Sequence, residues 1–320
     1  MPANNQFDMP IAIALHGGAG TILRSEMSPE KEVQYTHALK DALHAAYQHL
    51  LDHGSALDAV EIAVTMLEDC PLFNAGKGSV FTAEGKHEMD ASIMEGRNRS
   101  AGAISLVTGV KNPIRLARLV MEKSEHVFLA GSGAMEFARK MKCDFADETY
   151  FFDRFRYDQW QKIKDTQSFQ LDHSVNTDQE KPKKMGTVGA VACDVQGNIA
   201  AATSTGGMTN KRWGRIGDSP VIGSGTYAHN LTCAVSCTGS GEYFLRGVVA
   251  YDVSCLIEYK NYSLAQACQE VILQRLLELG GDGGLVAVNA KGEVSMTFNT
   301  EGMYRASKSP LGETIAIYDA

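Results

Sequence analysis

The chain has 320 residues, of which 44% are hydrophobic, and its 30 basic and 38 acidic residues give a formal net charge of −8. This acidic balance, with scattered lysines and arginines, argues against nucleic acid or an anionic membrane as a partner. The seven cysteines are odd in number and include no Cys-x-x-Cys pair, which favours free thiols over a disulfide framework. Residues 1–9 lack the pattern of a secretory signal, and no run of about 20 apolar residues occurs, so we expect a cytoplasmic protein with no membrane partner.

Apolar runs and helix caps predict the elements that precede residue 160. Ser28 and Pro29 are typical of a helix start, and Ser55 is typical of the cap of the next helix. A short apolar run leads into an expected glycine turn at 16–20. The predicted strands cover 11–15, 88–94 and 101–108, and the predicted helices cover 29–53, 56–69 and 113–124.

The composition changes between 161 and 184, where Gln, Lys, Asp, Ser and Asn dominate, as is typical of a flexible linker. Ordered patterns return at Thr187, and Ser263 with Gln266 matches a capping box. The predicted strands cover 188–194, 198–205, 231–238, 285–289 and 293–298, and the predicted helices cover 242–259 and 263–279. Strands and helices without regular alternation predict an α+β sandwich of two antiparallel-rich sheets covered by helices.

Thr187 stands where the polar stretch ends and an apolar strand begins. If the chain were cut between Gly186 and Thr187, the new terminus would carry a hydroxyl and an α-amine on one residue. The amine titrates near ~7.7–8, so it can serve as a general base at neutral pH. One residue would then supply both the nucleophile and the base. Because Gly-Thr-Val is also an ordinary start for a strand, the case depends on the residues downstream.

Motifs of several other enzyme classes are missing from the sequence. His16-Gly17-Gly18 is similar to the oxyanion strand of esterases, but Val221 stands where a Gly-x-Ser-x-Gly elbow would need its second glycine. No phosphate-binding glycine loop and no His-Glu-x-x-His metal motif occurs. We therefore expect no cofactor for the chemistry.

Glycine-rich turns after Thr187 carry polar side chains suited to an amino-acid substrate. Arg215 can bind a carboxylate with two parallel hydrogen bonds, and Asp218 can pair with an ammonium group. The hydroxyl of Thr238 and the N–H of Gly239 can hold a developing oxyanion. Together these groups indicate recognition of a zwitterionic head group and hydrolysis of an amide.

These residues lie in motifs that resemble the plant-type asparaginases, also called isoaspartyl peptidases or β-aspartyl-peptidases, of the N-terminal nucleophile hydrolase superfamily. The likeness is greatest to the bacterial members of that family. The set of motifs spans the chain and is highly specific. The motifs lie at 16–20 (HGGAG), 72–76 (LFNAG), 186–241, 205–211 (TGGMTNK) and 298–305 (FNTEGMYR).

The resemblance implies a four-layer αββα sandwich, the fold of N-terminal nucleophile hydrolases, formed by a single domain over 1–320. It implies that the chain cuts itself before Thr187. The products would be an α subunit, 1–186, with a flexible linker at 161–186, and a β subunit, 187–320. Two such αβ units would associate as an (αβ)2 heterotetramer.

The resemblance also implies the roles of the catalytic residues. Thr187 would attack the Gly186 carbonyl during its own maturation and then the substrate. Thr205 would hydrogen-bond to this nucleophile. The oxyanion hole would be formed by Thr238 and Gly239.

Binding residues follow from the same resemblance. Arg215 would bind the α-carboxylate of the substrate, while Asp218 and the Gly241 carbonyl would hold its α-amine, with Thr238 and Gly239 facing the reacting carbonyl. Relatives bind a structural sodium ion through main-chain carbonyls of one loop. The matching residues here are Leu67, Glu68, Cys70, Phe73, Ala75 and Lys77.

The implied reaction is hydrolysis of β-aspartyl dipeptides and L-asparagine through a β-aspartyl ester on Thr187. A glycosylasparaginase is the nearest rival activity, although that group usually has Asp where this chain has Gly186. The sequence also allows an uncleaved amino-acid-binding protein on the same scaffold, or a cytosolic esterase. It leaves open the preference between asparagine and dipeptides, the rate of cleavage, the fate of the linker and any dependence on potassium.

Overall fold

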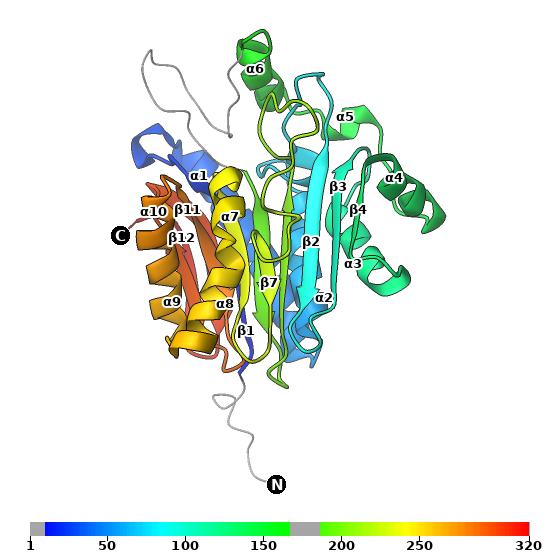
Figure 1. Ribbon diagram of the computed structural model, residues 1–320. Helices are drawn as coiled ribbons and strands as arrows, with labels where there is room; N and C mark the ends of the chain where they lie inside the picture. The colour runs from blue at the N-terminus through cyan, green and yellow to red at the C-terminus, as the bar shows by residue number, and fades with distance from the viewer. Residues whose placement is uncertain (1–9, 167–185, 320) are drawn as a thin grey trace.

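The computed structural model describes residues 10–166 and 186–319, which form a mixed α/β fold with two β-sheets (Figure 1). The larger sheet takes strands from both sides of the interval 167–185, whereas the smaller sheet takes strands only from the C-terminal side. In the part of the chain that the structure describes, no helix is long and apolar enough to cross a lipid bilayer.

The larger sheet has eight strands in the order β12-β11-β1-β5-β6-β2-β3-β4. Every neighbouring pair is antiparallel except β3 with β4, which is parallel. The strand that follows Thr187, β5, therefore lies near the centre of the sheet. The strands are β1 (Ala12–Gly20), β2 (Met89–Glu95), β3 (Ala101–Val107), β4 (Phe128–Ala130), β5 (Val188–Cys193), β6 (Ile199–Thr205), β11 (Gly302–Ser309) and β12 (Gly312–Tyr318).

The smaller sheet has four antiparallel strands in the order β10-β9-β8-β7. It packs on the larger sheet, since β5 contacts β8, β1 contacts β9 and β6 contacts β7. Its strands are β7 (Thr226–Ala228), β8 (Ala234–Gly239), β9 (Gly283–Val288) and β10 (Val294–Phe298).

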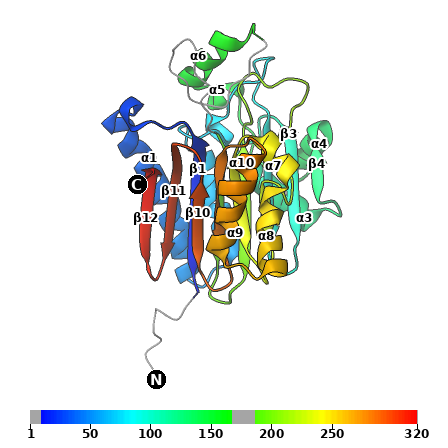
Figure 2. The same cartoon turned by 60° about the vertical axis from the view of Figure 1, so that its left-hand side comes forward.

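Helices cover both sheets on their outer sides (Figures 1 and 2). On the larger sheet, α1 packs on β1 and β11, α2 on β5 and β6, α3 on β2 and β3, and α4 on β3 and β4. Two others, α8 and α9, pack together against the smaller sheet. The helices are α1 (Pro29–Leu51), α2 (Ala56–Glu68), α3 (Pro113–Lys123), α4 (Gly131–Lys140), α5 (Glu148–Phe151), α6 (Arg154–Ile163), α7 (Gly241–Gly247), α8 (Val249–Lys260), α9 (Leu264–Glu270) and α10 (Leu276–Glu278).

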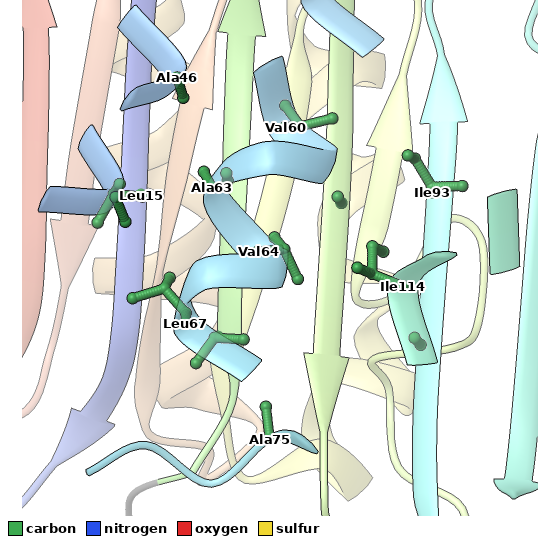
Figure 3. Close-up of a cluster of buried hydrophobic side chains, with 14 of the residues drawn as sticks. Leu15, Ala46, Val60, Ala63, Val64, Leu67, Ala75, Ile93 and Ile114 are labelled. Carbon is green, nitrogen blue, oxygen red and sulfur yellow. The ribbon is translucent and has the colours of Figure 1, made fainter. Parts of the chain in front are cut away.

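The strand β5 is buried on both faces because its side chains alternate between two hydrophobic cores. Val188 and Ala190 belong to the core beneath the helices α1 to α3, whereas Val191 and Cys193 belong to the core that includes the smaller sheet. Figure 3 shows the first core, where residues of α2 such as Val64 pack over the strands. A residue at the head of β5 is thus held between two packed layers.

Most predicted elements are confirmed, with boundaries shifted by a few residues. The side chains of Ser28 and Ser55 cap α1 and α2 as expected. The capping box of Ser263 and Gln266 is present at the start of α9. The hairpin that follows Thr187 is formed by β5 and β6. Caps and hairpins depend on neighbours in sequence, which is why the sequence predicts them well.

Other expectations are wrong. The run at 16–20 is not a turn, because it continues β1 through a bulge between His16 and Gly18 and pairs with β11. The helix expected over 242–259 breaks at Val248, whose φ of 48° lies in the left-handed region. The predicted linker begins too early, since α6 runs through Ile163, which is buried. Its remaining part, 167–185, lies outside the described residues.

Candidate active site

The hydroxyl of Thr187 is buried at the head of β5, beside the peptide bond that precedes it. Its Oγ lies 2.7 Å from the carbonyl oxygen of Gly186 and 3.3 Å from the Oγ of Thr205. The hydroxyl of Thr205, the last residue of β6, donates to the same Gly186 oxygen at 2.6 Å. The pairing of β5 with β6 therefore brings the predicted nucleophile and its predicted neighbour together.

Asn74 is a site residue that the sequence does not single out. Its Nδ2 donates to the carbonyl oxygens of Gly186, at 3.1 Å, and Gly207, at 2.7 Å. Gly186 has a φ of 151°, and a Cβ built on it would lie 2.2 Å from Asn74 Nδ2. Glycine is thus required before Thr187 by both conformation and space. The one signal for Asn74 was its place inside the LFNAG motif at 72–76.

His16 contacts the nucleophile residue from β1. Its Nδ1 lies 3.2 Å from the carbonyl oxygen of Thr187, and its Nε2 lies 2.9 Å from the Oγ of Ser236. Complete burial lowers the pKa of His16 to about 3, so the ring is neutral at neutral pH. The sequence singled out this histidine through its glycine motif but predicted no contact for it with Thr187.

Arg215 and Asp218 meet at Gly241, as the sequence predicted for a head-group site. A Cβ built on Gly241 would lie 2.8 Å from Asp218 Oδ1 and 2.9 Å from Arg215 Nη2. Burial raises the pKa of Asp218 to about 7, while the nearby Arg215 opposes that rise. The Oδ2 of Asp218 is buried and has no hydrogen-bond partner among the described residues, so it is suited to receive an ammonium group.

Glu242 is a second residue that the sequence analysis missed at this site. Its carboxylate accepts two hydrogen bonds from Arg215, from Nε at 2.8 Å and from Nη2 at 2.9 Å. The guanidinium is therefore held at one edge by the first turn of α7. A bound carboxylate would have to share Arg215 with Glu242 or displace it.

Thr238 and Gly239 end β8 just before α7 begins, at the predicted boundary between strand and helix. The hydroxyl of Thr238 accepts a hydrogen bond from the N–H of Ala19 at 3.3 Å. Gly239 has a φ of 150°, and a Cβ built on it would lie 2.4 Å from Asp282 O. The structure thus places Thr238, one of the two predicted oxyanion donors, beside β1, which also carries His16.

The loop after α2, with the residues predicted to bind sodium, folds tightly around two glycines. A Cβ on Gly76 would lie 2.5 Å from Glu68 O, and a Cβ on Gly78 would lie 2.1 Å from Phe73 O. The ammonium group of Lys77 lies 5.2 Å from the ring centroid of Tyr150. The two glycines therefore let the loop pass close to main-chain carbonyl oxygens. Hard cations prefer oxygen ligands of this kind, so this donor set fits a sodium ion.

The side chain of Glu68, the last residue of α2, is completely buried. It accepts hydrogen bonds from the hydroxyl of Ser204, at 2.6 Å, and the N–H of Ile114, at 2.9 Å. Complete burial raises its pKa to about 8. Among residues 10–166 and 186–319, no group of three or more His, Cys, Asp or Glu side chains could hold a metal ion. The main-chain carbonyls thus remain the candidate ligands.

Comparisons with known proteins agree with the motifs. A family model described as asparaginase matches residues 9–315. An isoaspartyl peptidase of Salmonella typhimurium is 50% identical over 92% of this chain and 94% of that protein. An isoaspartyl peptidase of Escherichia coli is 51% identical over 92% of this chain and 91% of that protein. An isoaspartyl peptidase/L-asparaginase of Xenopus laevis is 40% identical over 97% of this chain and 96% of that protein.

The burial of a neutral His16 predicts a dependence of stability on pH. An unfolded histidine titrates near 6.5, so between pH 6.5 and 3 the unfolded chain binds more protons, and stability falls as the pH falls. His16→Asn should reduce that loss by about 1–2 kcal/mol between pH 6.5 and 5. Urea unfolding at several pH values, with and without His16→Asn in a Thr187→Ala single chain, measures the difference. The same change in unfolding free energy with pH in the two proteins would contradict the prediction.

Proposed function

This chain belongs to the asparaginase family, and we propose that it hydrolyses the amide bond on the β-carboxyl of aspartate, in β-aspartyl dipeptides and in L-asparagine. The observation that carries this proposal is the Gly186 carbonyl, which accepts hydrogen bonds from Thr205 and Asn74 beside the hydroxyl of Thr187. That arrangement supports a buried threonine that first cuts its own chain and then acts as an N-terminal nucleophile.

Self-cleavage would begin with attack of Thr187 Oγ on the carbonyl carbon of Gly186. The hydroxyl proton passes to the nitrogen, the C–N bond breaks as the ester forms, and the nitrogen becomes the α-amine of Thr187. Water then hydrolyses the ester and leaves a carboxylate on Gly186. Thr205 and Asn74 would stabilise the charge that develops on the carbonyl oxygen. We propose that one domain, 1–320, is thereby divided into subunits 1–186 and 187–320.

Substrate hydrolysis would use the same hydroxyl with the newly freed amine as its base. The amine takes the proton as Oγ attacks the side-chain carbonyl, and ammonia or an amino acid leaves with a proton. Thr238 and Gly239 would hold the oxyanion. Water then releases aspartate from the β-aspartyl ester. No cofactor takes part in either step of this scheme.

Recognition of the substrate would depend on the two charged residues that meet at Gly241. Arg215 would bind the α-carboxylate by sharing its guanidinium with Glu242 or by displacing Glu242. The buried oxygen of Asp218 and the Gly241 carbonyl would accept hydrogen bonds from the α-ammonium group. The opposite charges of the two ends explain why an amino-acid head group would be preferred to an uncharged amide.

We further propose that the two packed sheets and their helices form the αββα sandwich of N-terminal nucleophile hydrolases. Contacts between the sheets, and helices on their outer sides, support this layering. An (αβ)2 heterotetramer is proposed from the family, and exposed apolar side chains on α8 and α10, such as Tyr259 and Leu277, support such an interface. All seven cysteines are free, which supports a cytoplasmic location.

Replacement of Thr187 tests the nucleophile. Thr187→Ala lacks the hydroxyl, so we expect a single uncut chain with at least 1,000-fold lower hydrolysis of a β-aspartyl dipeptide, on the order seen when a nucleophile is removed. Thr187→Ser keeps the hydroxyl and should still cut itself and turn over substrate. Electrophoresis under denaturing conditions and a coupled assay for released amino acid measure both effects. Wild-type activity in Thr187→Ala would refute the proposal.

Replacement of Arg215 tests the head-group site. Arg215→Ala removes a charge-assisted pair, so KM for a β-aspartyl dipeptide should rise roughly 10- to 100-fold. Arg212→Ala is a matched control in the same loop, because Arg212 donates to the carbonyl of Thr166 rather than facing Asp218. Steady-state kinetics of both variants decide the point. If Arg215→Ala raises KM no more than Arg212→Ala does, Arg215 does not bind the substrate.

We also propose that main-chain carbonyls of the loop after α2 hold a sodium ion that stabilises the loop without entering the chemistry. The proposed ligands are Leu67, Glu68, Cys70, Phe73, Ala75 and Lys77. Exchange of sodium for tetramethylammonium at constant ionic strength should lower Tm by about 2–5 °C, because a ligand of the folded state alone stabilises that state. An unchanged Tm across a sodium titration would contradict the proposal.

A further inference from the structure

A row of register partners crosses the centre of the larger sheet at the level of His16. His16 on β1 pairs with Gly189 on β5, which pairs with Thr203 on β6, which pairs with Ser92 on β2. Because partners in register point to one face of a sheet, these residues share the face that lies against the smaller sheet. A polar row therefore lies inside an otherwise apolar interface between the sheets.

The first half of this row connects to the loop that carries Asp218. The hydroxyl of Ser92 lies 2.6 Å from the carbonyl oxygen of Ser219, the next residue in that loop. It also lies 2.7 Å from the hydroxyl of Thr226 on β7. The hydroxyl of Thr226 lies 2.6 Å from that of Thr203. The three contacting side chains are fully buried, so water does not compete for them.

The second half of the row leads to the nucleophile residue. The hydroxyl of Thr203 lies 2.7 Å from that of Ser236, the register partner of Thr226 in the smaller sheet. Ser236 Oγ lies 2.9 Å from His16 Nε2, and His16 Nδ1 lies 3.2 Å from the carbonyl oxygen of Thr187. Six consecutive contacts thus join the loop at Ser219 to Thr187 across both sheets.

The hydrogens available in this chain of contacts make its members depend on one another. Both ends, at Ser219 and Thr187, are carbonyl oxygens that only accept. Two longer contacts of 3.3 Å, from Thr226 Oγ to the Ser219 carbonyl and from Thr203 Oγ to the Gly225 carbonyl, compete for the same hydrogens. Four hydroxyl hydrogens and one hydrogen on a neutral imidazole are therefore fewer than the contacts that they serve. A bond from His16 Nδ1–H to Thr187 requires Ser236 to donate to Nε2, so Thr203 and Ser236 form a hydrogen bond only if Thr203 donates. The orientation of each hydroxyl therefore constrains that of its neighbour.

The space for these contacts is provided by Gly189. A Cβ built on that residue would lie 1.9 Å from Ser236 Oγ and 2.6 Å from His16 Nε2. Any side chain at Gly189 would push apart the histidine and the serine that meet beneath it. Gly189 has no side chain, so its place in the row is filled by the contact between His16 of the larger sheet and Ser236 of the smaller sheet.

We propose that Ser92, Thr226, Thr203, Ser236 and His16 form a hydroxyl relay of positioning residues that aligns Thr187 with the substrate loop at Asp218 and Ser219. This inference rests on the proposed function and adds to it a role for residues that do not touch the substrate. The relay fixes the Thr187 carbonyl, and with it the orientation of the hydroxyl and the amine. Its loss should therefore slow the reaction more than it weakens binding.

Thr203→Val tests the relay, because it keeps the shape of the side chain and removes the central hydroxyl. We expect kcat per cleaved chain to fall at least tenfold with a β-aspartyl dipeptide, while KM changes less than threefold. Thr203→Ser restores a hydroxyl and should recover kcat to within threefold. Thr232→Val is the matched control, since the buried hydroxyl of Thr232 contacts Ser254 Oγ and the His229 carbonyl rather than a member of the relay. It should keep wild-type kcat and KM within twofold.

A double-variant cycle separates the relay from independent effects on folding. Ser236→Ala should lower kcat by a similar factor. The double variant that combines Thr203→Val and Ser236→Ala should have a kcat within twofold of either single variant, because all three variants break the same relay. If Thr203→Val fails to fold by circular dichroism, Ser92→Ala replaces it in the cycle. Wild-type kcat in the folded relay variants, or losses that multiply in the double variant, would overturn the relay. An inactive wild-type enzyme would instead refute the proposed function.

Discussion

The carbonyl oxygen of Gly186 is the group on which the arrangement of the site depends. It accepts hydrogen bonds from Thr205 and Asn74, and Thr187 Oγ lies 2.7 Å from it. A partly buried carbonyl needs one partner to be satisfied, so side-chain donors from both Thr205 and Asn74 are more than a strand requires. They suit an oxygen on which negative charge develops. The head of β5, the end of β6 and the loop after α2 all converge on this atom.

Burial gives the polar groups around that atom their chemical states. It keeps His16 neutral, so the ring can donate to the Thr187 carbonyl while it accepts from Ser236. It also raises the pKa of Asp218 to about 7, so an incoming cation would stabilise the ionised form of this carboxyl group. The two packed sheets that exclude water are thus the source of both the rigidity and the electrostatics of the site.

The sequence predicts local features of this protein better than distant contacts. The caps at Ser28 and Ser55 and the hairpin that ends at Thr205 depend on near neighbours and are confirmed. The bonds of Asn74 to Gly186 and of His16 to Thr187 join residues 112 and 171 positions apart, and no periodicity reports them. The glycine run at 16–20 has the local pattern of a turn, yet pairing with β11 makes it a strand. Motif resemblance, rather than pattern, pointed to these segments.

Self-cleavage before Thr187 is tested most directly by the intact mass of the purified wild-type protein after incubation, with N-terminal sequencing of its fragments. The geometry at Gly186 predicts two chains, and the second should begin Thr187-Val188-Gly189. A protein that turns over a β-aspartyl dipeptide while it remains a single chain of 320 residues would contradict an N-terminal threonine nucleophile.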